Sequence, residues 1–431
     1  MGFISVIPAI LAIVLSFITR NTIVSLTIAC IAGTLLAGQG IFGFPTLLQN
    51  SLGTTSFSWV MLLNTFIGIL VAYFQKTGAI QGFSQKVHEK NLSRRGAQLM
   101  AWVLGIFIYF SDSFSPLFVG SVMRSITDKA KVSREKLAYI ADSTSAPVSV
   151  LMPITGWAAY LMGLAVGVGC IATTEDASRL FLRAIPFNFY PIFAVLFVGL
   201  LASGIIKDFG PMKKAEKRAW EEGKVIRDGA TPLIGKELTD MLPYPGLKPR
   251  VVLNFILPVF VIIGIALGTY IAFDSAKTME AFLFVVIIMT ISMMIQGIPF
   301  KEVMNTLTDG VKGAIPAVML PAVIFAVAAI MSFATGSSWG TFAICMPIAL
   351  PLAFSFTDNQ MSLLIVACFA AVAGGGVFGD HCSPLSDTTV LSSTGAASDH
   401  IDHVKTQLPY ALICGLLAFI AYLIIGIFFI Q

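Results

Sequence analysis

Charged side chains are scarce in this sequence. Asp, Glu, Lys and Arg make up 12% of the 431 residues, whereas hydrophobic residues make up 56%. Soluble domains carry roughly 25% charged residues. Several uncharged runs reach the ~20 residues that a helix needs to cross the hydrocarbon core of a bilayer. The composition therefore excludes an ordinary soluble domain and predicts a polytopic membrane protein whose surroundings are the lipid bilayer.

Paired cysteines and nucleotide-binding motifs are also lacking. The six cysteines are scattered, mostly in apolar segments, without the spacing of a zinc site or a disulfide framework. No P-loop sequence occurs, which disfavours an ATP-driven pump, and no motif indicates a bound cofactor. The net charge of +4 gives no reason to expect nucleic acid as a partner. The apolar N-terminus lacks the basic segment and cleavage site of a signal peptide, so we expect a retained transmembrane helix.

One charged segment divides the apolar spans. Residues 207–249 are rich in Lys, Arg and Pro and predict a cytoplasmic linker, partly helical around KKAEKRAWEEGK, with its charges in solvent. The chain then consists of an extra N-terminal helix (1–20), a first transmembrane repeat (21–206), the linker (207–249) and a second repeat (250–431). The spans 137–172, 312–357 and 361–395 are too long for one crossing, since the first would make a helix of about 54 Å. We expect these three spans to be broken or kinked.

The two halves of the chain resemble each other. YIADSTSAPVSVLMPITGW (139–157) and VFGDHCSPLSDTTVLSSTG (377–395) share an Asp, a following Ser, a nearby Pro and a hydroxyl-rich run. Inverted repeats that meet at broken helices are typical of secondary transporters. The predicted fold is all-α and polytopic, with two inverted five-helix repeats plus the N-terminal helix, about eleven spans in all.

The positive-inside rule places the linker and the basic loop around Arg134 in the cytoplasm. The N-terminus is then inside and the C-terminus outside. The loop from Lys76 to Arg95 conflicts with this placement, because it faces outward if residues 97–126 cross the membrane once.

Four carboxylates occur within these spans, two in each repeat, with no Lys or Arg in the same breaks. A buried carboxylate without a partner takes up a proton or binds a cation, so Na⁺ and H⁺ can compete for it. Neighbouring hydroxyls offer the hard oxygens that Na⁺ prefers. An Asp at the start of a half-helix can instead serve as an N-cap, and mid-membrane Ser and Thr often only pack between helices. The candidate ion-binding residues are Asp380, Ser383, Asp387, Thr388, Asp142, Ser143 and Thr144.

Other polar residues suggest proton coupling and substrate binding. Asp112, Asp380 and His381 are the candidates for proton coupling, since a His pKa lies near neutrality, although a His beside an Asp is more often structural. His400 and His403 are expected at the membrane surface. The run SFATGSSWGTF (332–342) predicts a broken helix whose N–H groups receive an anionic group, unless it only packs. The substrate-binding candidates are Asp112, Ser337, Ser338, Trp339 and Thr341.

These segments resemble the NhaC-type sodium/proton antiporter family, within the wider ion-transporter superfamily. The matching stretches are FATGSSWGTFAICMPIALP, GGGVFGDHCSPLSDTTVLSSTGAASDHIDHVKTQLPYAL and VGSVMRSITDKAKVSREKLAYIADSTSAPVSVLMPITGW. The resemblance implies inverted repeats, with Asp380, Ser383, Asp387 and Thr388 at one ion site and Asp142, Ser143 and Thr144 at a first-half site. His381 and Cys382 depart from the pattern GDK-x-SPLSDTT, and the chain looks more like the branch that contains amino-acid carriers.

The expected function is sodium-coupled secondary active transport by alternating access, in the inner (plasma) membrane, with Na⁺ and H⁺ as coupling ions. The favoured cargo is a cationic, lysine-like amino acid, because carboxylates outnumber basic residues in the breaks. Na⁺/H⁺ antiport without an organic substrate is the alternative, and a passive channel or an intramembrane enzyme is a remote one. We expect no enzymatic activity. Homodimerisation is left open.

Overall fold

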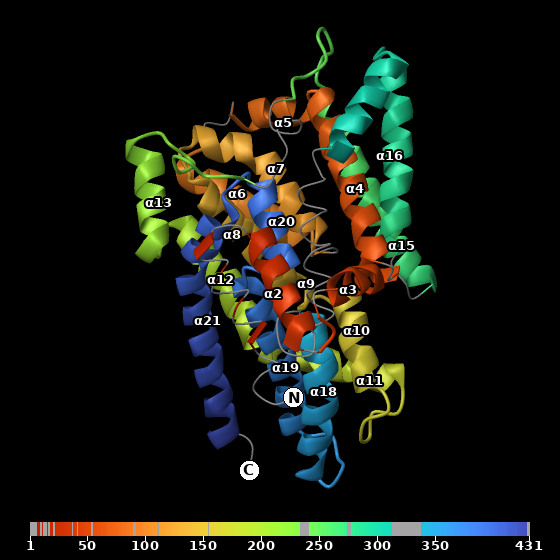
Figure 1. Ribbon diagram of the computed structural model, residues 1–431, viewed down its shortest axis with the longest axis vertical. Helices are drawn as coiled ribbons and strands as arrows, with labels where there is room; N and C mark the ends of the chain where they lie inside the picture. The colour runs from red at the N-terminus through yellow and green to blue at the C-terminus, as the bar shows by residue number, and fades with distance from the viewer. Residues whose placement is uncertain are drawn as a thin grey trace.

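The computed structural model describes residues 22–88, 92–273, 277–312 and 338–428, without 37, 41, 53–54, 110–111, 154 and 233–240, together with 7–8, 11, 15 and 18–19. The described chain is helical, and within it an isolated bridge between Val168 and Ile171 is the nearest approach to a strand. Figure 1 shows the helices packed into an elongated bundle, with α5 and α13 towards one end and the loop after α18 at the other.

The helices before the linker are α2 (Thr22–Leu36), α3 (Gly43–Leu52), α4 (Thr55–Lys76), α5 (Ala79–His88), α6 (Arg94–Phe107), α7 (Phe114–Lys129), α8 (Arg134–Ser143), α9 (Ala146–Ser149), α10 (Gly156–Ala165), α11 (Thr174–Ala184), η2 (Ile185–Phe187) and α12 (Phe189–Ser203). The linker contains α13 (Gly210–Glu221). It is followed by η3 (Val252–Ile256), α15 (Leu257–Phe273), α16 (Thr278–Ile295), α18 (Ser338–Ser355), α19 (Leu363–Cys382), α20 (Asp387–Gly395) and α21 (His400–Phe428).

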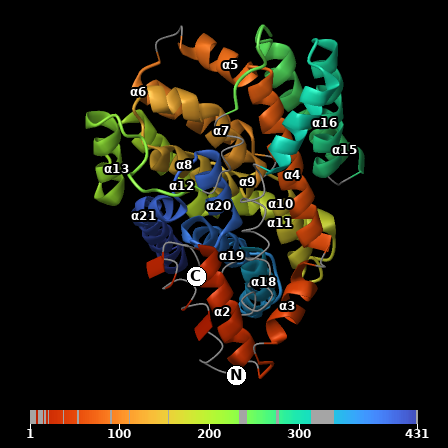
Figure 2. The same ribbon diagram turned by 45° about the horizontal axis from the view of Figure 1, so that its top comes forward.

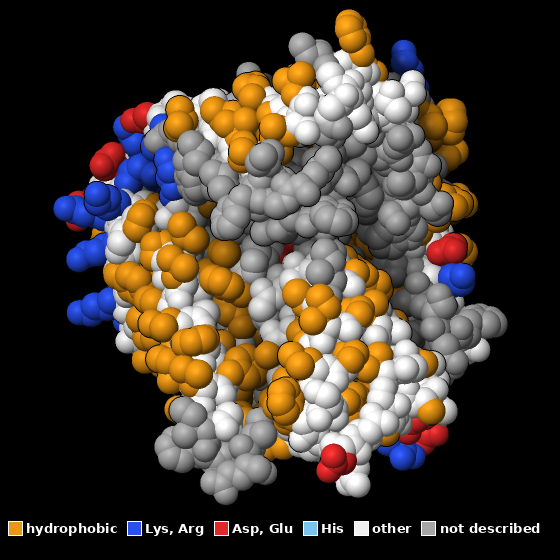
Figure 3. Space-filling view, turned by 60° about the horizontal axis from the view of Figure 1, so that its bottom comes forward, with side chains coloured by type: hydrophobic (Ala, Val, Ile, Leu, Met, Phe, Trp, Pro, Cys, Tyr) orange, Lys and Arg blue, Asp and Glu red, His pale blue; other side chains and the backbone are white. Residues whose placement is uncertain are grey.

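Three stretches, Val252–Thr269, Leu363–Cys382 and His400–Gly426, are long and apolar enough to cross a membrane. Thr174–Phe187 and Phe189–Ser203 form a further candidate, bent by 45° at Asn188. Figure 3 shows broad hydrophobic surfaces on the outside of the bundle, as lipid contact requires. These observations fit the predicted polytopic membrane protein, whereas its span count remains a prediction.

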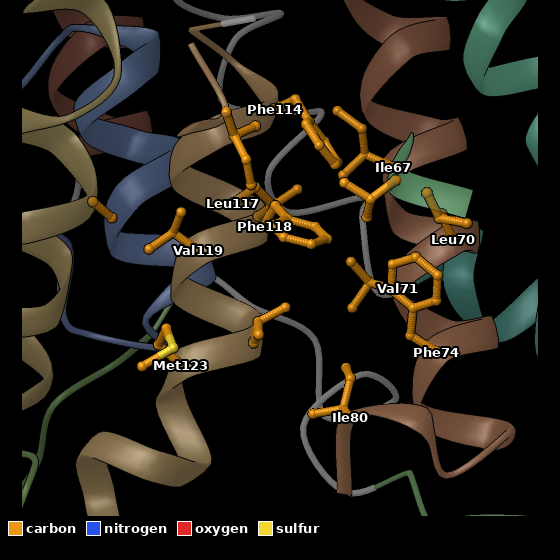
Figure 4. Close-up of a cluster of buried hydrophobic side chains, with 14 of the residues drawn as sticks. Ile67, Leu70, Val71, Phe74, Ile80, Phe114, Leu117, Phe118, Val119 and Met123 are labelled. Carbon is orange, nitrogen blue, oxygen red and sulfur yellow. The ribbon is translucent and has the colours of Figure 1, made fainter. Parts of the chain in front are cut away.

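Two hydrophobic clusters form the core. In the first, α4, α7 and η3 meet, and Phe118 packs against Phe74 and Phe255 with ring centroids 6.3 and 5.5 Å away (Figure 4). Helices α15 and α16 lie side by side next to α4 and extend this cluster (Figures 1 and 2). The second cluster joins α10, α11, α12, α18, α19 and α21.

The long spans break where the chain passes from one cluster to the other. Ala141 of α8 packs in the first cluster and Ala146, after the break, in the second. Val377 of α19 packs in the second cluster and Ala396, beyond α20, in the first. The predicted breaks in 137–172 and 361–395 are therefore confirmed. The break predicted within 312–357 falls on 313–337, outside the described residues.

The two broken segments run in opposite directions. The start of α8 contacts the linker, because the N–H of Arg134 donates to the carbonyl of Val225 over 2.9 Å. On α20 the far end lies on that side, since Arg134 also donates to the carbonyl of Ala397 over 3.2 Å. The antiparallel course agrees with the predicted inverted relation of the halves, although it does not by itself establish a repeat.

Residues 97–126 form a hairpin rather than the single crossing considered above. Arg94, at the start of α6, donates to the Glu216 carboxylate over 2.6 Å, and the N–H of Ser133, beyond α7, donates to that carboxylate over 2.8 Å. Both ends of the hairpin thus lie on the linker side, with the polar turn around Asp112 between its arms. The Lys76 carbonyl likewise accepts from the N–H of Tyr244 over 2.8 Å. The conflict with the positive-inside rule disappears, because Lys76 and Arg94 lie with the linker.

The linker packs against the helix bundle, and some of its charged side chains pair with buried residues there. The predicted helix around KKAEKRAWEEGK is confirmed as α13. Lys217 and Glu221 are exposed as expected, but Arg218 reaches the buried Glu135 of α8 over 2.9 Å. Asp208 pairs with the buried Lys136 of α8 and accepts from the Tyr410 hydroxyl of α21 over 2.9 Å. The linker therefore fixes the start of α8 and contacts α21 at Tyr410, and both helices carry site residues. The proposed division into domains remains a prediction.

Candidate functional site

Asp380 lies at the end of α19, where the helix stops before Pro384. Its side chain is 4% exposed. One carboxylate oxygen, Oδ1, accepts from the Ser386 hydroxyl over 2.9 Å, and Oδ2 accepts from the Thr388 hydroxyl over 3.2 Å. Both hydroxyls come from the four-residue break and the first turn of α20. The break thus surrounds a buried carboxylate with hard oxygen atoms.

The neighbouring candidates Ser383 and Asp387 make local contacts. The Ser383 hydroxyl oxygen accepts from the N–H of Leu385 over 3.0 Å, and it does not reach Asp380 by a hydrogen bond. Asp387 accepts from the N–H of Thr388 over 3.0 Å, as a residue at the start of a helix often does. Both side chains are partly exposed. They border the Asp380 site, and the second hydroxyl at Asp380 comes from Ser386 instead.

Asp142 lies in the last turn of α8 and is 0% exposed. Its Oδ2 accepts from the Gln407 amide over 2.7 Å and lies 3.3 Å from Nε2 of His403, both on α21. Its Oδ1 is buried without a hydrogen-bond partner among the residues that the structure describes. The predicted neighbours turn elsewhere: Ser143 Oγ lies 3.0 Å from His381 Nε2, and Thr144 donates to the Ile140 carbonyl of its own helix over 2.8 Å.

His381 lies at the centre of the polar contacts between the halves. Its Nδ1 lies 2.6 Å from the Tyr190 hydroxyl of α12, and its Nε2 contacts Ser143 of α8. Its backbone carbonyl accepts from the Gln407 amide. His381 thus joins α8, α12, α19 and α21, which supports both a structural role and a role in proton transfer.

The four predicted carboxylates, Asp112, Asp142, Asp380 and Asp387, are together called the carboxylate group. Within the described part of the chain, no Lys or Arg side chain pairs with Asp112, Asp380 or Asp387, and no group of three or more His, Cys, Asp or Glu residues could hold a metal ion.

Asp112 is tied to the aromatic part of the predicted substrate site. Its Oδ2 accepts from the Trp157 indole over 2.8 Å. The Trp157 ring packs on Trp339 at 5.4 Å, and Tyr160 packs on Trp339 at 4.7 Å. Trp339 is 38% exposed. Ser338 is buried, Thr341 is partly buried, and Ser337 lies outside the described residues.

His400 and His403, expected at the membrane surface, are buried inside the protein, and their level in the membrane remains a prediction. His403 is buried against Asp142, and His400 is buried between Ser393 and the Pro384 carbonyl, 3.1 and 2.8 Å away. Sequence reasoning also missed Gln407 and Tyr190. One signal was present: His403 and Gln407 are four residues apart and so lie on one face of the helix, where buried polar groups need partners.

Comparison with known proteins identifies the family of this chain. The model of the Na⁺/H⁺ antiporter family matches residues 148–320 and 311–427. The chain belongs to the Na⁺/H⁺ antiporter family. The resemblance to NhaC-type antiporters is thereby confirmed, and membership of the Na⁺/H⁺ antiporter family makes the chain a sodium-coupled transporter rather than an enzyme.

Three relatives are informative. An uncharacterized protein of Haemophilus influenzae is 32% identical over 98% of this chain and 90% of its own length. The arginine/ornithine antiporter ArcD of Halobacterium salinarum is 32% identical over 27% of this chain and 25% of its own. The malate-2H⁺/Na⁺-lactate antiporter of Bacillus subtilis is 31% identical over 26% of this chain and 22% of its own. The last two matches are partial, so their substrates do not transfer directly.

Proposed function

We propose that this transporter binds Na⁺ at Asp380 and moves it by alternating access in the inner membrane. The observation that carries the proposal is a buried carboxylate at a helix break that accepts from two hydroxyls and has no cationic partner among the described residues. Ser386 and Thr388 supply hydroxyl oxygens beside it. In a low-dielectric site such a carboxylate requires a proton or a cation, so the two ions compete. Asp112, Asp380 and His381 remain our candidates for the proton-coupling residues, and Asp387 and Ser383 border the site.

The arrangement of the broken helices supports alternating access. Segments α8–α10 and α19–α20 cross in opposite directions, and both break beside the carboxylate group. Inverted repeats that meet at discontinuous helices allow a site near the midplane to open to either side of the membrane. Asp142 belongs to the first-half side of this site, and we propose that it shares in binding the ion.

We further propose a cationic amino acid as the cargo. Carboxylates predominate in the breaks, and Asp112 lies beside the partly exposed aromatic group of Trp157, Tyr160 and Trp339. Aromatic faces attract ammonium and guanidinium groups by about 0.5–2 kcal/mol, more strongly where water is excluded. The name of the ArcD relative agrees with such a cargo. Na⁺/H⁺ exchange without an organic substrate is the alternative. Because one relative is named as a malate/lactate antiporter, anionic substrates are also included in the test.

Purified protein in liposomes distinguishes these functions. Na⁺-gradient-driven uptake of labelled lysine, arginine, ornithine, lactate and malate is measured beside a pH-sensitive dye. We expect uptake or exchange of a basic amino acid, reduced at least tenfold in affinity by Trp339→Ala. Trp220→Ala, on the exposed surface of α13, is the matched control. A Na⁺-driven pH change with no organic substrate in the panel rejects the cargo proposal, and the absence of any Na⁺-dependent transport rejects the proposed function.

A further inference from the structure

Gln407 of α21 contacts the ends of both broken helices. Its amide nitrogen donates to Oδ2 of Asp142, at the end of α8, over 2.7 Å. The same nitrogen donates to the backbone carbonyl of His381, at the end of α19. The side chain is 0% exposed, so both contacts are made without competition from water.

The His381 carbonyl needs this donor because of the local sequence. In a continuing helix it would accept from the N–H of Leu385, four residues later. That N–H instead donates to the Ser383 hydroxyl over 3.0 Å, because the chain turns at Pro384. The carbonyl would remain unsatisfied at the helix end, and Gln407 supplies the missing hydrogen bond.

Asp142 also depends on α21. Gln407 and His403 supply its hydrogen bonds, while its Oδ1, the Gln407 Oε1 and the His403 Nδ1 are buried without partners in the part of the chain that the structure describes. A polar cluster in low dielectric is sensitive to the loss of one member, since each unpaired group is expensive there. Gln407 touches both the charge of α8 and the terminal carbonyl of α19, so its loss changes both ends.

We propose that Gln407 is the positioning residue that holds the Asp142 carboxylate against the end of α19 and so links the two halves of the ion site. This inference rests on the proposed function. Gln407 acts through Asp142, since its amide bonds go to Asp142 and to the His381 carbonyl, whereas the Asp380 carboxylate accepts from Ser386 and Thr388. Movement at one helix break is then transmitted to the other through the Gln407 amide, beside the direct contact of Ser143 with His381.

A double-mutant cycle tests the proposal. Gln407→Met keeps the length of the side chain and removes both donors, and Asp142→Asn removes the charge on which Gln407 acts. We expect each single variant to raise the KM for Na⁺ by about tenfold or more, in line with loss of a hydrogen bond to a charged group. The double variant should match Asp142→Asn within about twofold, because coupled residues are not additive.

Two further variants serve as controls for the double-mutant cycle. Gln98→Met is the control, since Gln98 is also buried and donates only to the Arg94 carbonyl of its own helix. Gln407→Asn keeps the amide on a shorter side chain and should raise the KM less than Gln407→Met. Wild-type KM for Na⁺ in Gln407→Met, or fully additive effects in the double variant, would overturn the assignment.

Na⁺-dependent thermal stabilisation of the purified variants provides a readout without transport. Binding of a ligand to the folded state raises its stability, so weaker Na⁺ binding moves the concentration dependence of the melting temperature. We expect Gln407→Met to shift that dependence to about tenfold higher Na⁺, and an unshifted curve counts against the proposal. If the wild type fails to transport, the proposed function fails, and the melting curves still decide the role of Gln407.

Discussion

Loss of Arg218 should destabilise the protein strongly, although this residue belongs to the linker. Arg218 lies on α13 and donates to the carboxylate of Glu135 over 2.9 Å, and Glu135 is only 2% exposed. Arg218→Ala leaves a buried carboxylate without its cation. Breaking a buried ion pair in this way costs about 3–5 kcal/mol of folding free energy. The start of α8 should loosen, and with it the position of Asp142.

The neighbouring residue offers a matched control. Lys217 pairs with Glu221 on the same helix over 3.7 Å, with both side chains exposed. An exposed pair is worth about 0–1 kcal/mol, so Lys217→Ala should leave stability nearly unchanged. Thermal unfolding of both variants in detergent, followed by tryptophan fluorescence, makes the comparison. Similar melting temperatures for the two variants would refute the claim that the linker stabilises the start of α8.

Two further predictions concern packing and orientation. Gly120→Ala should destabilise the protein by about 1–3 kcal/mol, because the new Cβ would lie 2.4 Å from the Gly395 backbone. Gly156→Ala is the control, since its Cβ would meet none of the described residues within 4 Å. Equal melting temperatures of the two variants would show that α7 and α20 can separate. The exposed Cys170 should react with a membrane-impermeant maleimide on intact cells. A cysteine introduced by Lys217→Cys in the linker should react only after permeabilisation. Labelling of both from one side contradicts the placement of the linker in the cytoplasm and of Cys170 outside.

The sequence was informative about where helices break. Residues such as Pro384, with Gly and hydroxyl-rich runs, interrupt apolar spans that are too long, and these signals are local. The helix in the linker was predictable for the same reason. The hairpin of α6 and α7 was not predictable from the sequence. Asp112 is the charged residue at the turn between its two apolar arms, and the length of the segment was compatible with a single crossing of the membrane. The contacts of Arg94 and Ser133 with Glu216 show that both ends of the segment lie on the linker side, so it forms a hairpin.

The site was predictable in part. Placement of acids in the breaks identified Asp142 and Asp380 as candidates, and the structure surrounds Asp380 with hydroxyls. The partners of Asp142 come from α21, more than 250 residues away, and no local pattern indicates which distant helix fills a given space. Gln407 was therefore missed. Roles in ion binding remain predictions for all of these residues.

Asp380→Asn tests the central claim most directly. The substitution removes the charge but preserves the shape of the side chain, and Asp228→Asn on the exposed linker is the control. Na⁺-dependent transport is measured in proteoliposomes across a range of Na⁺ concentrations. The account predicts that Asp380→Asn inserts and purifies but loses Na⁺-dependent transport, while Asp228→Asn behaves as wild type. Wild-type Na⁺ dependence in Asp380→Asn would contradict the assignment of the ion site.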